Sequence, residues 1–166
     1  YNENVGGSIM MKSIEWRHSA SDVAKWFLQR NFLQMEAEDA EYISNLKLQK
    51  LLYYAQGVYS AITDGRLFDD NLVAWEHGPV VIDVYHEYAK YGARGIEYDK
   101  ENPPKETYTE EEEGVLEEVY QHFGQYSAWK LRDMTHEERP WKITPRNKVI
   151  KLDVIRDFFK EEYVTN

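Results

Sequence analysis

The sequence contains no cysteine, so disulfide bonds and thiolate chemistry are excluded, and no metal site can rest on sulfur. It also has no apolar run that approaches the roughly 20 residues needed by a membrane-spanning helix. The N-terminus lacks the charged and then apolar layout of a signal peptide. These absences predict a cytoplasmic protein with no membrane segment.

Basic residues are few relative to acidic ones: 20 Lys and Arg stand against 30 Asp and Glu, for a formal net charge of −10. Such a charge repels phosphate backbones, so direct binding of nucleic acid is disfavoured. We interpret the basic cluster within residues 139–151 as a local patch. A neutral or basic protein is the expected partner, and a homo-oligomer is also compatible with this composition.

The length of 166 residues fits one domain of ordinary size. Residues 1–12 include Gly6-Gly7-Ser8 and two consecutive methionines. We interpret them as a leader or a remnant of cloning and expect them to be disordered. The domain is expected to cover residues 13–166.

The spacing of apolar residues predicts a mainly α fold: a single compact helical domain of about six helices with a small β-hairpin or paired extended segments. A first helix is expected to begin after Ser19 or Ser21 and to end near Phe32. The central helix is expected to begin at Ser44 or Asn45 and to end at Asp64-Gly65, where Gly65 can adopt a left-handed conformation.

The hairpin or paired extended segments are expected over residues 67–76. Gly78 is expected to have a positive φ, and Pro79 to stand in the first turn of a helix that Gly92 ends. Residues 93–107 lack periodicity and predict a mobile loop.

Two capping boxes are expected in the second half of the chain, one from Thr109 to Glu112 and one from Thr135 to Glu138. Ser127 can cap a shorter helix, and residues 146–151 suggest a short extended piece. A last helix is expected after this piece, because apolar residues recur there at helical spacing: Val154, Ile155, Phe158, Phe159 and Tyr163.

Enzymatic motifs are missing: the sequence has no HExxH pair, no glycine-rich phosphate loop and no Gly-x-Ser-x-Gly elbow. We therefore expect no catalytic centre, no metal and no cofactor. Histidines His77, His86, His122 and His136 do stand near carboxylates, so a metal-dependent hydrolase remains a weaker alternative.

Several separated segments occur in a characteristic order. They are Leu46–Gln56, Leu67-Phe68-Asp69, Ala74-Trp75 with Gly78-Pro79-Val80, Val84-Tyr85, Tyr91-Gly92, and Leu131 with Thr135–Trp141. Together they resemble the Panacea antitoxin domain of the SocA-like family, also known as phage-associated GepA proteins. The resemblance implies an antitoxin that neutralises a toxin encoded beside it by direct binding, without enzymatic chemistry. The alternative is a phage-associated adaptor or regulatory protein that binds a host factor.

Six residues are candidates for partner binding: Tyr53, Tyr54, Asp69, Asp70, Trp75 and His77. Adjacent helix positions face different directions, so at least one of the two tyrosines is expected at a groove or interface. Packing of Trp75 in the core, and a capping role for His77 at the turn, are the alternatives. Six further residues are expected to be structural: Gly78, Pro79, Thr135, His136, Pro140 and Trp141.

Overall fold

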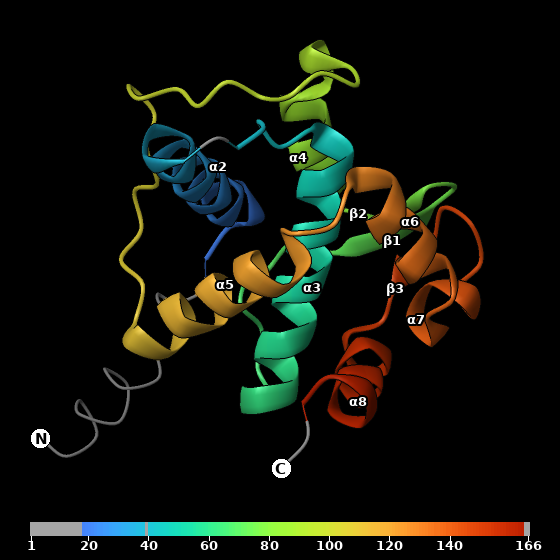
Figure 1. Cartoon of the computed structure of the whole chain (residues 1–166). Helices are drawn as coiled ribbons and strands as arrows, with labels where there is room; N and C mark the ends of the chain where they lie inside the picture. The colour runs from blue at the N-terminus through green and yellow to red at the C-terminus, as the bar shows by residue number, and fades with distance from the viewer. Residues whose placement is uncertain (1–17, 39, 165–166) are drawn as a thin grey trace, which may run out of the picture.

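The computed structural model describes residues 18–38 and 40–164, so the leader expected over residues 1–12 lies outside the described part of the chain. Within those ranges seven α-helices, one short 3-10 helix and a three-stranded sheet follow one another (Figure 1). The expected fold class, mainly α with a small hairpin, is confirmed. The helix beyond the six expected is the single turn α7, Arg139–Lys142.

Helices α2 (Ala20–Ala37) and α3 (Asn45–Thr63) begin where the sequence predicts. The hydroxyl of Ser19 accepts a hydrogen bond from the amide of Asp22, and that of Ser44 from the amide of Lys47. Helix α2 continues five residues past the predicted end at Phe32, because the residues that follow contain no glycine or proline to stop it.

The residue that ends α3 differs from the prediction. Asp64 is left-handed, with φ 62° and ψ 8°, and its amide donates to the carbonyl of Ser60. The sequence argument gave this role to Gly65, but aspartate also tolerates the left-handed region. The carboxylate of Asp64 also accepts a hydrogen bond from Lys160 of the last helix, at 2.7 Å.

The sheet has the order β2-β1-β3 and is antiparallel, with β1 at Leu72–Trp75, β2 at Gly78–Val80 and β3 at Val149–Ile150. Pro79 pairs with Ala74 in β2, so its predicted place in a first helical turn is wrong. Helix α4, Ile82–Glu87, begins three residues later. Proline fits here because β2 is an edge strand, where its missing N–H removes no ladder hydrogen bond.

After α4 the chain makes the 3-10 helix η1, Ala89–Tyr91, and then turns at Gly92, whose φ is +57°. Residues 93–107 contain no helix or strand, as expected. Hydrogen bonds hold both ends of this loop. The amide of Ile96 donates to the carbonyl of Ile43, and the carboxylate of Asp22 accepts from two backbone amides in the loop and from the hydroxyl of Tyr108. These bonds restrain the segment, and its mobility stays a prediction.

The second half of the chain forms α5 (Glu110–Phe123), α6 (Ala128–His136), α7 and α8 (Leu152–Glu162). The capping box of Thr109 and Glu112 is confirmed, with bonds of 3.1 and 2.8 Å. The second box is wrong. Thr135 lies in the last turn of α6, where its hydroxyl donates to the carbonyl of Arg132. Glu138 stands immediately before α7, but its side chain makes no capping hydrogen bond. Its carboxylate instead accepts hydrogen bonds from tyrosines in the core.

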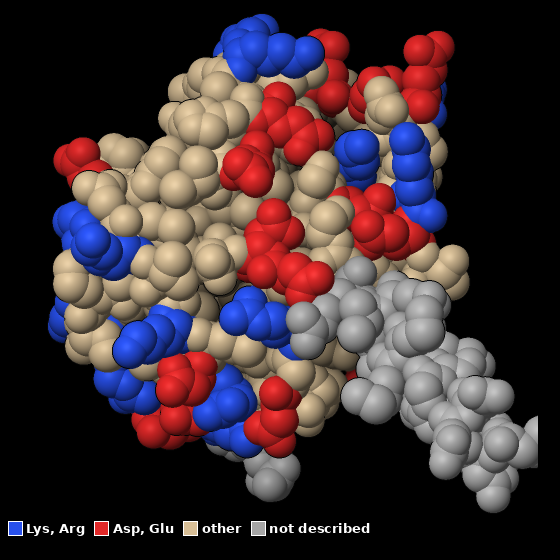
Figure 2. All heavy atoms as spheres, turned by 180° about the vertical axis from the view of Figure 1, so that it is seen from behind, with Lys and Arg blue, Asp and Glu red and all other residues tan. Residues whose placement is uncertain are grey.

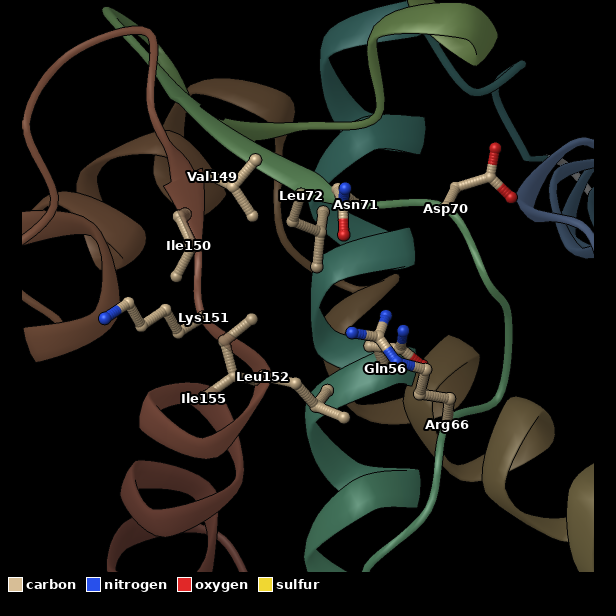
Figure 3. A pocket seen from close by; sticks show the side chains of 10 residues that line it. All are labelled: Gln56, Arg66, Asp70, Asn71, Leu72, Val149, Ile150, Lys151, Leu152 and Ile155. Carbon is tan, nitrogen blue, oxygen red and sulfur yellow. The ribbon is translucent and has the colours of Figure 1, made fainter.

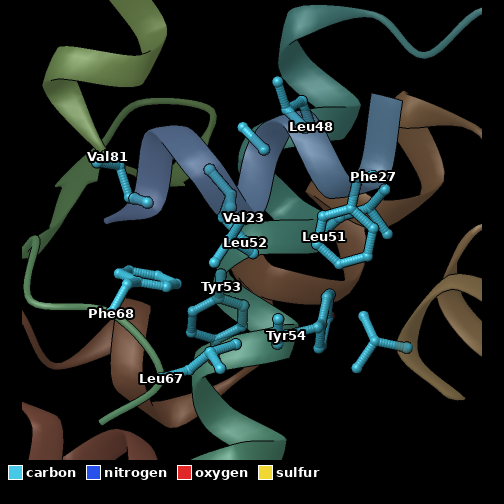
Figure 4. Close-up of a cluster of buried hydrophobic side chains, with 14 of the residues drawn as sticks. Val23, Phe27, Leu48, Leu51, Leu52, Tyr53, Tyr54, Leu67, Phe68 and Val81 are labelled. Carbon is cyan, nitrogen blue, oxygen red and sulfur yellow. The ribbon is translucent and has the colours of Figure 1, made fainter. Parts of the chain in front are cut away.

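Helix α3 occupies the centre of the molecule and packs against α2, α5, α6, α8 and strand β2 (Figure 1). Figure 4 shows its apolar side chains among those of α2, the loop before β1 and the segment after β2. From Leu51 to Ala55 every residue is 0% exposed. Because this part of α3 is covered on all sides, its polar residues are buried as well. No helix in the described ranges is long and apolar enough to cross a membrane.

Candidate functional site

Tyr53 and Tyr54 both lie inside the protein, each 0% exposed, so the prediction that one of them faces a groove or partner is wrong. Adjacent residues do face different directions, but α3 has neighbours on every side. The ring of Tyr54 stacks on Phe123 of α5 with centroids 3.8 Å apart, and Tyr53 packs edge-on against Phe159 of α8. Their role in the folded state is structural.

Both phenols converge on one buried carboxylate. Glu138, 6% exposed, accepts hydrogen bonds from Tyr53 and Tyr54 at 3.0 Å each and from Tyr163 at 2.5 Å. Burial raises the pKa of Glu138 to about 7, although the three phenol hydrogen bonds act in the opposite direction. We call Glu138 and these tyrosines the Glu138 cluster. It joins α3 and α8 to the segment between α6 and α7.

A second buried group, Lys50, lies beneath the hairpin. Its side chain is 0% exposed, and its ammonium donates to the carbonyl of Pro79 at 2.9 Å. Burial lowers the pKa of Lys50 to about 7. Gly78 has a φ of +109°, which agrees with the positive value expected. A Cβ at Gly78 would stand 2.7 Å from both Lys50 Cε and Thr135 Oγ1, so the hairpin, α3 and α6 meet at this glycine.

The remaining structural motif residues connect α7 to the hairpin. The indole N–H of Trp141 donates to the carbonyl of Trp75 at 2.7 Å. His136 stacks on Trp141 with centroids 4.0 Å apart, and burial lowers the pKa of that histidine. Pro140 is buried in the first turn of α7. The structure therefore brings together two motif segments that are about 60 residues apart in the sequence.

An exposed cluster covers this junction. Arg132 donates from Nε to Nδ1 of His77 at 3.0 Å, and its guanidinium carbon lies 4.5 Å from the ring centroid of Trp129. The ring of Trp129 is also 5.6 Å from that of His77 and the residue is 55% exposed. His77 therefore contacts α6 and does not cap the following helix.

A hollow of about 490 Å³ lies beside His77. Trp75 and Tyr85 form one wall, with rings edge-to-face at 5.0 Å, and Leu46 and Val80 also line it. The amide of Gln49 is occupied by the protein itself, since it accepts from the amide of Val81 and donates to Asn45. We call the surface formed by Trp75, His77, Tyr85, Trp129 and Arg132 the hairpin face.

The candidate carboxylates Asp69 and Asp70 lie away from the hairpin tip, in the segment that leads into β1. Asp69 is exposed, and its amide donates to the carbonyl of His18. Asp70 lines a different hollow, of about 270 Å³. Figure 3 shows its carboxylate pointing toward α2, where it accepts from the amide of Ala20 at 2.8 Å. Asp70 thus satisfies one of the unpaired amides at the start of that helix.

Replacing Asp70 with alanine is expected to lower the free energy of unfolding by about 1 to 2 kcal/mol, because the first turn of α2 loses an acceptor and a favourable charge. Urea titration followed by circular dichroism measures this. Asp70→Asn keeps an oxygen at the same place and should recover part of the loss. Equal midpoints for wild type and Asp70→Ala would show that the bond contributes nothing to stability.

The histidines do not form a metal site in the described part of the chain, where no three His, Asp or Glu side chains are placed to hold an ion. His18, which the sequence argument did not single out, lies with Nδ1 2.7 Å from Glu106 and Nε2 3.0 Å from Glu112. This pair of contacts joins the beginning of α2 to the beginning of α5.

Sequence reasoning missed four residues of this region: Lys50, Trp129, Arg132 and Glu138. Three of them carry a signal in the sequence. Lys50 stands three and four positions before Tyr53 and Tyr54, inside the apolar arc of α3. Trp129 and Arg132 are three positions apart, so they share a face of α6. Glu138 has no such signal, because its two partners on α3 are about 85 residues away and Tyr163 is 25 residues away.

The comparisons with known proteins agree with this arrangement of motifs. The family described as "Antitoxin SocA-like, Panacea domain" matches residues 48–142, which run from α3 through α7. Neither the curated proteins nor the solved structures give a match. The matched residues include Lys50, the tyrosine pair, the hairpin and Glu138, which form the interior described above. On this match over more than half of its length, the chain belongs to the SocA-like Panacea antitoxin family.

Proposed function

We propose that this protein is an antitoxin that neutralises a protein toxin, encoded beside it, by binding it directly through the hairpin face. The observation that carries the proposal is Trp129, a tryptophan that is 55% exposed beside His77 and Arg132 and close to an apolar hollow. Tryptophan, tyrosine and arginine supply most of the binding energy in protein interfaces. An aromatic side chain of the toxin would fill the hollow and pack against the wall formed by Trp75 and Tyr85.

The buried titratable groups also support a binding role. The ammonium of Lys50 is bound to the carbonyl of Pro79, and the carboxylate of Glu138 to three phenols. Both groups are enclosed, with 0% and 6% exposure. They therefore hold the scaffold that presents the hairpin face.

The surface charge favours a protein partner over a nucleic acid. Figure 2 shows Asp and Glu side chains in a broken band through the middle of the rear face, with Lys and Arg scattered around it. With a net charge of −10, the approach of a phosphate backbone is opposed and that of a basic protein is accelerated. We therefore propose that the toxin carries a net positive charge.

Trp129→Ala is expected to weaken binding of the product of the adjacent gene by about 2 to 4 kcal/mol, because an exposed tryptophan is the residue best placed to be buried by a partner. That loss corresponds to a rise in Kd of at least about 30-fold. Isothermal titration with the purified toxin measures it, and growth of cells that express both proteins reports neutralisation.

Leu33→Ala is the matched control, since Leu33 is 56% exposed on α2 and belongs to a different surface. It should leave both Kd and growth unchanged. If Trp129→Ala binds as tightly as Leu33→Ala, the hairpin face is not the docking surface. If the wild-type protein does not bind the neighbouring product at all, the antitoxin proposal fails and the alternative of an adaptor for a host factor takes its place.

A further inference from the structure

Helix α6 has a second exposed side, which the hairpin face does not use. Lys130, Asp133, Met134 and Glu137 follow one another at helical spacing along α6 and its end, and they line one side of a groove. Phe158, Glu162 and Tyr163 of α8 and its end line the other side. The groove has a volume of about 550 Å³, and Glu138 also lines it. We call it the α6–α8 groove.

The groove combines an apolar floor with an acidic rim. Phe158 is 8% exposed, and Met134 and Tyr163 are half-buried beside it. Glu137 and Glu162 are exposed on opposite sides of this floor. The rim also carries Asp133, which is paired with Arg132 at 3.0 Å, and a single amine, that of Lys130. Three carboxylates therefore stand against one amine along the rim, and the guanidinium of Arg139, 5.6 Å from the ring centroid of Phe158, is paired with Glu161.

We propose that the α6–α8 groove binds a basic amphipathic segment of a partner protein. Apolar side chains of that segment rest on Met134, Phe158 and Tyr163, and its lysines or arginines lie against Glu137 and Glu162. An amphipathic helix that lays its apolar face into a groove between two helices is an established mode of recognition. This site is separate from the hairpin face and does not depend on the partner being a toxin.

Charge decides between the possible occupants of the groove. A second copy of this chain carries a net charge of −10, which opposes its approach to the carboxylates of the rim. A nucleic acid would meet the same repulsion. A basic segment replaces that repulsion with attraction, and its apolar side covers the floor that water otherwise contacts.

The test uses a model peptide of about 14 residues, close to the length of an average helix, with leucine at helical spacing and lysine elsewhere. A companion peptide carries glutamate in place of every lysine. Isothermal titration should show that the protein binds the lysine peptide and not the glutamate peptide. The double variant Glu137→Lys with Glu162→Lys should bind the lysine peptide at least about tenfold more weakly, because it reverses the charge at the rim.

The control double variant is Glu101→Lys with Glu118→Lys, which makes the same change in net charge at two exposed residues outside the groove. It should retain most of the affinity. Met134→Ser should weaken binding with an unchanged salt dependence, because it removes apolar contact only. Thermal midpoints close to wild type show that each variant is folded. Equal losses in the two double variants, or undiminished binding by the groove variant, would overturn the proposal without bearing on toxin neutralisation.

Discussion

Replacing Gly78 with alanine is expected to lower the free energy of unfolding by about 2 to 6 kcal/mol, a large part of the stability of an ordinary domain. Two costs add. The φ of +109° is a conformation that residues with a side chain adopt only with strain. The new Cβ would also stand 2.7 Å from Lys50 Cε and Thr135 Oγ1, both enclosed in the core. Urea unfolding of the purified variant measures the loss.

Pro79→Ala is the matched control at the neighbouring position. Pro79 lies in an edge strand, and its carbonyl, which accepts from Lys50, is kept in the variant. The loss should therefore be about 1 kcal/mol, the cost of removing part of one buried ring. A larger loss for Pro79→Ala than for Gly78→Ala would contradict the close approach of Lys50 and Thr135 to this glycine.

Glu138→Ala is expected to destabilise the protein by a similar amount, about 2 to 6 kcal/mol. The variant leaves the hydroxyls of Tyr53 and Tyr54 buried without their acceptor, and each buried unsatisfied group costs about 1 to 3 kcal/mol. Removal of the side chain also leaves a cavity. Tyr163 is half-buried, so its hydroxyl can find water. Thermal unfolding in parallel with wild type measures the combined effect.

The pH dependence of stability gives a separate test of the same residue, with Glu138→Gln as the reference. Burial raises the pKa of Glu138 from 4.5 to about 7 in the folded state. Between these values the folded protein holds the proton more tightly than the unfolded chain does. The stability that Glu138 contributes relative to glutamine is therefore fully present below pH 4.5 and is lost as the pH rises through 7. The slope is at most about 1.4 kcal/mol per pH unit.

Lys50 is present in both proteins, so its own titration cancels from this difference. A constant difference between pH 4.5 and 7 would mean that the carboxyl titrates at its ordinary pKa and is not desolvated as the structure indicates. Glu138→Ala with unchanged stability would mean that the tyrosine hydroxyls find other acceptors.

Local patterns in the sequence were enough to predict most helices. Apolar spacing placed α3 and α8, and the side chains of Ser19, Ser44, Thr109 and Ser127 mark helix starts because each accepts from an amide nearby in the chain. The predictions failed where contacts with residues distant in the sequence determine the local structure. Pro79 is compatible with both a first helical turn and an edge strand, and pairing with β1 selects the strand.

The candidate site was also predicted only in part from local patterns. The sequence placed the hairpin over residues 67–76, with Trp75 near its end and His77 beyond it, whereas the strands pair over residues 72–80 and put both residues at the hairpin tip. It expected at least one of Tyr53 and Tyr54 at a groove or interface, because periodicity says which residues share a face and not how many neighbours a helix has. The acceptor of both tyrosines, Glu138, stands in a polar run that resembles a capping box, and only the packing of α7 against α8 brings it inside.

The separation in sequence between bonded partners also sets an order of events during synthesis. Lys50 and the two tyrosines of α3 leave the ribosome long before Glu138, which is about 85 residues further along the chain. Translation at about 5 to 20 residues per second delays their acceptor by about 4 to 17 seconds. Throughout that time the most apolar helix is without α6, α7 and α8. Nascent chains that stop before Glu138 therefore expose an unsatisfied core and are open to proteases and chaperones, whereas the finished chain closes over it.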